Sequence, residues 1–151
     1  QSRPINTNTV SSLDLKRYMG RWYEIARYDH SFERNLDECE AFYSLLPDGK
    51  ISVVNTGVNS KTGKHKSSYG KAKAGRKVGQ LRVSFFWIFY SDYNILALDD
   101  DYEWALVGSK SPKYLWILSR TRQLDSATKR EILDIAERRG YDTRELIWVK
   151  Q

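Results

Sequence analysis

Cys39 is the only thiol in the chain and the side chain best suited to covalent chemistry. A cysteine becomes a nucleophile when a nearby base or cation lowers its pKa. His30 lies in a predicted loop from which it can approach Cys39, and His65 is placed less favourably for this role. The chemistry would be attack on an electrophilic ligand. Because the sequence shows no clear activating partner, the favoured interpretation is that Cys39 is a small apolar residue of a wall.

Trp22 and Arg120 suggest a second kind of contact, which is structural. A guanidinium group stacks well on an indole ring. Trp22 stands at the start of the first predicted strand, and Arg120 ends the last long one. This pair predicts a barrel that is closed at one end by the stack and open at the other.

Several classes of function find no support in the sequence. It contains no nucleophile elbow, phosphate-binding loop or dinucleotide fingerprint. It also lacks the spacing of histidine, cysteine and carboxylate residues that is typical of a metal site. Only two histidines are present, and neither is expected deep inside the fold, which disfavours haem. We therefore expect no metal and no cofactor.

Charge and hydropathy narrow the possible partners. The net charge of +6 comes from basic residues spread over strands and turns, without an aromatic stacking platform, so we do not expect nucleic acid as a partner. No apolar run approaches the ~18 residues of a membrane-spanning helix. The polar residues 1–12 predict a flexible leader, and residues 13–151 a single domain.

Short alternating segments separated by turns predict an all-β fold. A helix follows the strands, with Asp125 as its N-cap, apolar residues at helical spacing and Gly140 just beyond its end. A short strand over 145–150 comes last. A series of strands with one late helix does not fit the alternating order of a parallel α/β sheet. The main strands are expected over 21–30, 40–46, 51–59, 64–74, 80–87, 93–99, 103–109 and 114–121.

Three segments, in this order, resemble the signatures of the lipocalin family. GRWYEIAR at 20–27 is similar to the first signature and LWILSRT at 115–121 to the third. LALDDDYEWALV at 96–107 resembles the second, although Leu98 replaces its usual threonine. The likeness runs from Leu13 to Val149 and is closest to bacterial outer-membrane lipocalins and apolipoprotein D-like lipocalins. It implies an eight-stranded antiparallel up-and-down β-barrel with one C-terminal α-helix and a final short strand.

The two ends of such a barrel should differ, because successive loops alternate between them. The signature residues meet at the closed end: Gly20, Trp22, Asp99, Tyr102 and Arg120. The open end combines apolar residues with lysines, which suits contact with an anionic lipid surface. The alternative is that its aromatic side chains fold over the cavity as a lid. The residues of this predicted rim are Trp87, Ile88, Phe89 and Tyr90.

Alternate residues of each strand face inward, and Trp22 and Arg120 fix the parity. Glu24 should then lie inside, where it needs a cation or a raised pKa. The resemblance to apolipoprotein D-like lipocalins adds Tyr43 and Asn55 to the lining. The predicted ligand-binding residues are Ala26, Tyr28, Cys39, Tyr43, Val53, Asn55, Trp116 and Leu118.

A mostly apolar wall with a few polar groups is typical of a small-molecule site. We expect the protein to bind, and to transport or store, a fatty acid, lysophospholipid or similar lipid without being an enzyme. The alternative is an enzyme acting on a lipid through Cys39, whose place is similar to that of the thiol in lipocalin-type prostaglandin D synthase. The bacterial likeness implies the periplasmic side of the outer membrane, as a lipoprotein whose anchor is missing from this chain.

Overall fold

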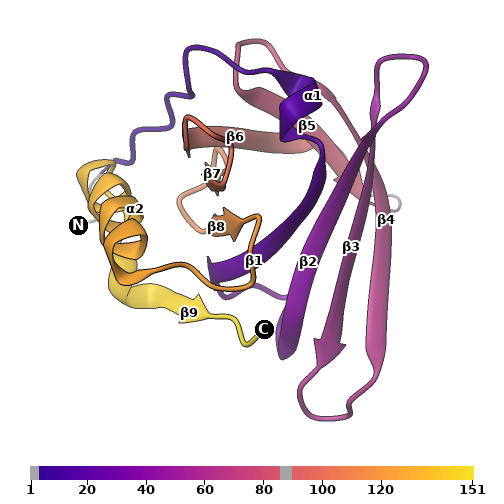
Figure 1. Ribbon diagram of the computed structural model, residues 1–151, viewed down its shortest axis with the longest axis vertical. Helices are drawn as coiled ribbons and strands as arrows, with labels where there is room; N and C mark the ends of the chain where they lie inside the picture. Colours follow the sequence, from indigo (N-terminus) through magenta and orange to yellow (C-terminus); the bar gives the residue numbers. More distant parts are fainter. Residues whose placement is uncertain (1–3, 86–89) are drawn as a thin grey trace.

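The fold is a closed antiparallel β-barrel with a helix packed on its outside (Figure 1). The computed structural model describes residues 4–85 and 90–151. Each strand pairs with the next, and the first strand closes the ring by pairing with both the eighth and the second. The eight barrel strands are β1 (Gly20–Tyr28), β2 (Leu36–Leu45), β3 (Ile51–Asn59), β4 (His65–Ala74), β5 (Gln80–Phe85), β6 (Ser91–Leu98), β7 (Trp104–Gly108) and β8 (Leu115–Ser119).

The predicted fold class is therefore confirmed, and most strand boundaries agree within a few residues. The largest difference is at β2, which begins at Leu36 rather than at residue 40. The register with β3 shifts between Asp37 and Glu40, so the start of this strand is irregular and loses the alternation that marks a strand in the sequence.

The outer helix α2 (Ser126–Arg138) begins as its sequence predicts. The Asp125 carboxylate accepts a hydrogen bond from the backbone N–H of Thr128 at 2.7 Å. Gly140, with φ of +98°, follows the end of the helix in a conformation that favours glycine. The 3₁₀ turn η1 (Thr143–Glu145) then leads to β9 (Leu146–Trp148), which pairs with the second half of β1.

Two apolar clusters result from this arrangement. One fills the closed end of the barrel around Tyr18, Trp22 and Ile95. The other lies between the barrel wall and α2, where Ile132 and Ala136 of the helix are fully buried. Among the described residues, no helix is long and apolar enough to cross a membrane.

The closed end is sealed around Trp22. The Arg120 guanidinium lies 3.7 Å from the centre of the indole ring, which is the contact that the sequence predicts. Arg120 also donates hydrogen bonds to the backbone carbonyls of Arg17, Arg21 and Tyr102. The short helix α1 (Leu15–Tyr18) covers this end, and the Trp22 N–H donates to the Tyr18 carbonyl.

The first residues differ from the flexible leader that their composition predicts. From residue 4 onward the segment runs along the barrel between α2 and α1 (Figure 1). The Asn6 N–H donates to the Arg139 carbonyl, and the Val10 N–H donates to the Ile95 carbonyl at 3.0 Å. These backbone bonds connect the segment to the barrel in a way that side-chain polarity does not reveal.

Candidate ligand-binding cavity

A cavity of about 420 Å³ occupies the barrel interior. Its apolar lining includes Val53 of β3, Val83 of β5, Val107 of β7 and Leu118 of β8. Its volume lies in the range of small-molecule sites. Six of the eight predicted ligand-binding residues line it: Cys39, Tyr43, Val53, Asn55, Trp116 and Leu118.

The other two, Ala26 and Tyr28, are on the opposite face of the wall, and their predicted orientation is wrong. Both are buried against the α2 side of the barrel. The cause is a β-bulge in β1, where the register with β8 shifts between Glu24 and Ala26. One extra residue reverses the alternation beyond it. Arg27 therefore takes the inward position that strict alternation assigns to its neighbours.

The bulge places two charged residues of β1 on the same side of the wall. The Arg27 Nη1 and Glu24 Oε2 atoms are 3.0 Å apart, and both side chains are almost completely buried. From the sequence, Glu24 needs either a cation or a raised pKa inside the barrel, and it has both. A bulge leaves no clear signal in a single sequence, so alternation alone cannot reveal Arg27.

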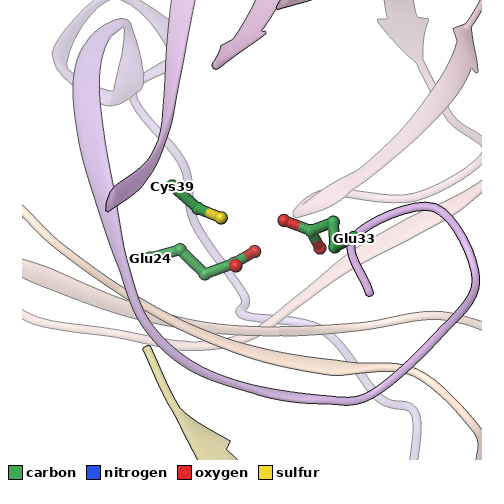
Figure 2. Close-up of side chains that lie close together, drawn as sticks. All are labelled: Glu24, Glu33 and Cys39. Carbon is green, nitrogen blue, oxygen red and sulfur yellow. The ribbon is translucent and has the colours of Figure 1, made fainter. Parts of the chain in front are cut away.

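A second carboxylate, Glu33, enters the cavity from the loop between β1 and β2, a position that sequence reasoning misses. Figure 2 shows the Glu24, Glu33 and Cys39 side chains pointing toward one another. One carboxyl oxygen of each glutamate and the sulfur of Cys39 all lie within 4.8 Å of one another. Glu33 Oε1 lies 2.7 Å from His30 Nε2 and accepts a hydrogen bond from the Trp116 indole at 3.0 Å. The only available signal is the spacing of three between His30 and Glu33.

The pKa values of the two carboxyl groups are shifted in opposite directions. Burial, followed by the charge of Glu33, raises the pKa of Glu24 well above its ordinary value. Burial also acts to raise the pKa of Glu33, but hydrogen bonds from His30, Glu24 and Trp116 outweigh it and lower this pKa to about 2. The two shifts are opposite, so Glu33 is the stronger acid of the pair and is ionised at neutral pH, and Arg27 lies beside both.

This arrangement makes a metal site unfavourable, although two carboxyl groups and a thiol converge. Arg27 Nη1 lies 3.0 Å from Glu24 and 3.8 Å from the Cys39 sulfur. The Arg27 guanidinium therefore already supplies a positive charge at the point where a metal ion would have to bind. A further cation would meet its repulsion in a buried setting.

The surroundings of Cys39 oppose nucleophilic chemistry. Its side chain is buried, and its sulfur packs closely against Gly57, where an added Cβ atom would lie only 3.3 Å away. Burial and the charges of Glu24 and Glu33 raise the pKa of the thiol, whereas catalysis needs it lowered. His30, the predicted activating residue, contacts Glu33 instead. His65 is exposed on β4.

The wall formed by β3 and β4 carries polar groups. Asn55 is opposite Ser68 in the β3–β4 register, and both line the cavity. Neither side chain has a hydrogen-bond partner within the described part of the chain. The exposed Lys66 also lines the cavity, with its ammonium 3.3 Å from the Phe32 carbonyl. These groups are available to a polar or anionic part of a ligand.

Three tyrosines lie between this wall and the closed end. Tyr93 oxygen is 2.6 Å from Tyr18 oxygen and 3.1 Å from Tyr43 oxygen. Burial raises the pKa of Tyr43 to about 12 and the pKa values of the other two above their ordinary value. All three are therefore neutral hydroxyl groups at physiological pH.

The remaining predicted residues fall into two groups. At the closed end, Asp99 accepts a hydrogen bond from the Glu103 N–H, and the Tyr102 hydroxyl accepts one from the Asp14 N–H. At the predicted rim, Trp87, Ile88 and Phe89 lie outside the described residues. Tyr90 is described, and its ring lies 4.2 Å from the Lys73 ammonium. Gly20, also predicted for the closed end, has a positive φ of +97°.

Comparisons with known proteins agree with this architecture. The family model of the lipocalin-like domain matches residues 13–151. The outer membrane lipoprotein Blc of Escherichia coli is 46% identical over 150 residues, covering 98% of this chain and 85% of that protein. Apolipoprotein D of Cavia porcellus is 31% identical, with coverages of 97% and 81%.

A solved structure gives the same result for the fold. Insecticyanin from the tobacco hornworm Manduca sexta superposes with a TM-score of 0.80 at 21% identity, covering 99% of this chain and 87% of that one. The resemblance to bacterial outer-membrane and apolipoprotein D lipocalins is confirmed by the sequence relatives. The chain belongs to the lipocalin family.

Proposed function

We propose that this protein binds a single-tailed lipid, such as a fatty acid or lysophospholipid, and carries or stores it without chemical change. The observation that carries the proposal is the cavity of about 420 Å³ inside the barrel, with its mainly apolar lining. Burying one methylene contributes ~0.8 kcal/mol, so a tail of ~14 methylenes gains ~11 kcal/mol. The loss of ligand freedom takes back several kcal/mol. The balance is compatible with micromolar or tighter binding.

The polar wall supports a specific orientation of this ligand. A carboxylate or phosphate near Asn55 and Ser68 would find unused hydrogen-bond donors and the Lys66 ammonium. The tail would then extend toward the tyrosines at the closed end. Glu33 also lines the cavity, and its ionised carboxylate repels an anionic head group from its own part of the wall.

Displacement of a fluorescent fatty acid by unlabelled fatty acid tests the proposal. Val53 faces the cavity and Val54 faces outward on the same strand, so Val53→Trp and Val54→Trp are matched variants. We expect Val53→Trp to weaken binding at least ~10-fold, because the indole fills the space of the tail. Val54→Trp should bind as the unchanged protein does. If the unchanged protein binds no fatty acid, or both variants bind equally well, the proposal fails.

The role of Lys66 has its own test. Lys66→Met should weaken binding of a fatty acid about threefold and leave binding of its methyl ester unchanged, because only the acid carries a charge. Lys64→Met, on the neighbouring exposed turn, is the matched control. An equal loss for acid and ester would contradict this orientation.

We further propose that the protein works on the periplasmic side of the outer membrane as an anchored lipoprotein, and that its open end contacts the membrane surface. The names of the bacterial relatives support the location. At the open end, the Phe32 side chain is 55% exposed. Fractionation of cells that express the natural gene tests this location, since recovery in the cytoplasmic fraction would contradict it.

A further inference from the structure

The hydroxyl groups of three tyrosines contact one another in a row at the base of the cavity, and one of their three hydrogens has no acceptor among them. Tyr93 is the central member, in contact with Tyr18 on one side and Tyr43 on the other. Three hydroxyl groups carry three hydrogens to donate, and two contacts use only two of them. Within residues 4–85 and 90–151, no other acceptor lies within reach of these oxygens.

The position of each ring decides where the unused hydrogen points. Tyr18 is fully buried and does not line the cavity, whereas Tyr43 and Tyr93 do. Leaving the hydrogen on Tyr18 would bury an unsatisfied donor in a dry interior, which is costly. The favoured arrangement is that Tyr18 donates to Tyr93, and that Tyr93 or Tyr43 directs the remaining hydrogen into the cavity.

The charge nearby favours the same outcome. Arg120, on the outer side of Trp22, contributes a positive potential at Tyr18 and Tyr43. A positive potential and an unused donor both favour an electron-rich oxygen. Trp22, Val53 and Leu118 surround this region and exclude most other polar partners.

We propose that the Tyr43–Tyr93 pair is a second polar subsite, which binds an oxygen acceptor near the far end of the ligand's tail. The preferred ligands are thus oxygenated lipids, with an anionic head at the β3–β4 wall and a carbonyl or similar oxygen at the tyrosines. This inference rests on the proposed function, because it requires a lipid that enters tail first.

The test compares saturated fatty acids of increasing length with the same acids carrying a ketone next to the terminal carbon. A ketone accepts a hydrogen bond and donates none, so it matches the single unused hydrogen. At the chain length whose end reaches the tyrosines, we expect the keto acid to displace a fluorescent fatty acid roughly fivefold better than its parent. At shorter lengths the ketone should bring no advantage.

Two variants assign the effect to the hydroxyls. The triple variant Tyr18→Phe/Tyr43→Phe/Tyr93→Phe removes every hydroxyl without leaving an orphaned donor, so its fold should persist. It should lose the preference for the ketone, so that each keto acid and its parent acid displace the fluorescent fatty acid equally well. Tyr18→Phe is the matched control, because it leaves Tyr43 and Tyr93 in the cavity with a hydrogen to spare, and it should keep the preference.

The outcomes separate the two proposals. If no fatty acid binds, the proposed function itself fails. If parent acids bind but no keto acid of any length binds better, the tyrosine subsite is wrong, as it would be if an ordered water already satisfied the unused donor. A preference that survives in the triple variant would also overturn it.

Discussion

The Arg27 guanidinium donates a buried hydrogen bond of 3.0 Å to the Glu24 carboxyl group, although the two residues stand three apart on one β-strand. In a regular strand, residues at this spacing point to opposite faces. The bulge after Glu24 brings both into the barrel and also turns Ala26 toward the helix. One backbone irregularity thus determines the charge inside the cavity and the packing outside it.

Removal of Arg27 should be much more harmful than removal of an exposed arginine. Arg27→Met removes the cation that lies beside the buried Glu24–Glu33 pair, and we expect a loss of about 3–5 kcal/mol in the free energy of unfolding. The matched variant is Arg21→Met, since Arg21 is 53% exposed and pairs with Glu40 at the surface. It should cost about 0–1 kcal/mol. Urea denaturation measures both, and equal losses would contradict a buried role for Arg27.

The two glutamates should control stability at opposite ends of the pH scale. The folded-state pKa of Glu24 is raised, so its contribution is present at low pH and is lost as the pH rises through that value. The pKa of Glu33 is lowered to about 2, so its contribution is present above pH ~4.5 and disappears as the pH falls toward 2.

Matched amide variants test these pH dependences through the midpoint of urea unfolding. Glu24→Gln should flatten the decline on the alkaline side, because glutamine can still donate to Glu33 and never ionises. Glu33→Gln should flatten the acid side and lower stability at neutral pH. An unchanged alkaline decline in Glu24→Gln would show that another group is responsible.

The reversed orientation of Ala26 can be tested with an inward alanine. Ala26 is fully buried in the cluster beneath α2, and Ala41 lines the cavity. Ala26→Leu should cost about 1–3 kcal/mol through overpacking, with little effect on lipid affinity. Ala41→Leu should reduce lipid affinity and change stability less, because the cavity has room. If Ala26→Leu instead reduced lipid affinity with little loss of stability, Ala26 would face the cavity, as strict alternation in β1 predicts.

Cys39 should react slowly with alkylating reagents. Its side chain is only 2% exposed, so a reagent reaches it rarely. Its pKa is raised, so little of the reactive thiolate is present. Iodoacetamide at neutral pH should modify the folded protein far more slowly than the urea-unfolded chain, as followed by mass spectrometry. Rapid modification of the folded protein would bring back the enzyme interpretation.

Arg120 should contribute more to stability than its neighbour Arg122, although both contact an aromatic ring. Arg120 stacks on Trp22 and bonds three backbone carbonyls, whereas Arg122 lies 5.2 Å from the ring of Tyr23 and is exposed. We expect Arg120→Ala to cost about 2 kcal/mol or more and Arg122→Ala under about 1 kcal/mol in thermal or urea unfolding. Similar losses in the two variants would contradict the claim that the stack of Arg120 on Trp22 stabilises the closed end.

The sequence by itself determined the barrel, its strand order and its closed end. Alternation and turn residues specify strands locally, and the capping residue Asp125 specifies the start of α2. The stack of Arg120 on Trp22 follows from the order of strands, because the two elements that carry it must meet in an up-and-down barrel. Most of the apolar lining follows from parity for the same reason.

Only the tertiary structure decided the polar interior. The bulge at Glu24 lies where one edge of β1 changes its partner from β2 to β9 while the other edge pairs with β8, and no single-sequence pattern marks it. Glu33 enters the cavity from a loop, and Tyr18 joins Tyr93 from a separate helix. Such contacts join residues far apart in the chain, and their pKa values depend on burial, so they exist only once the barrel has closed.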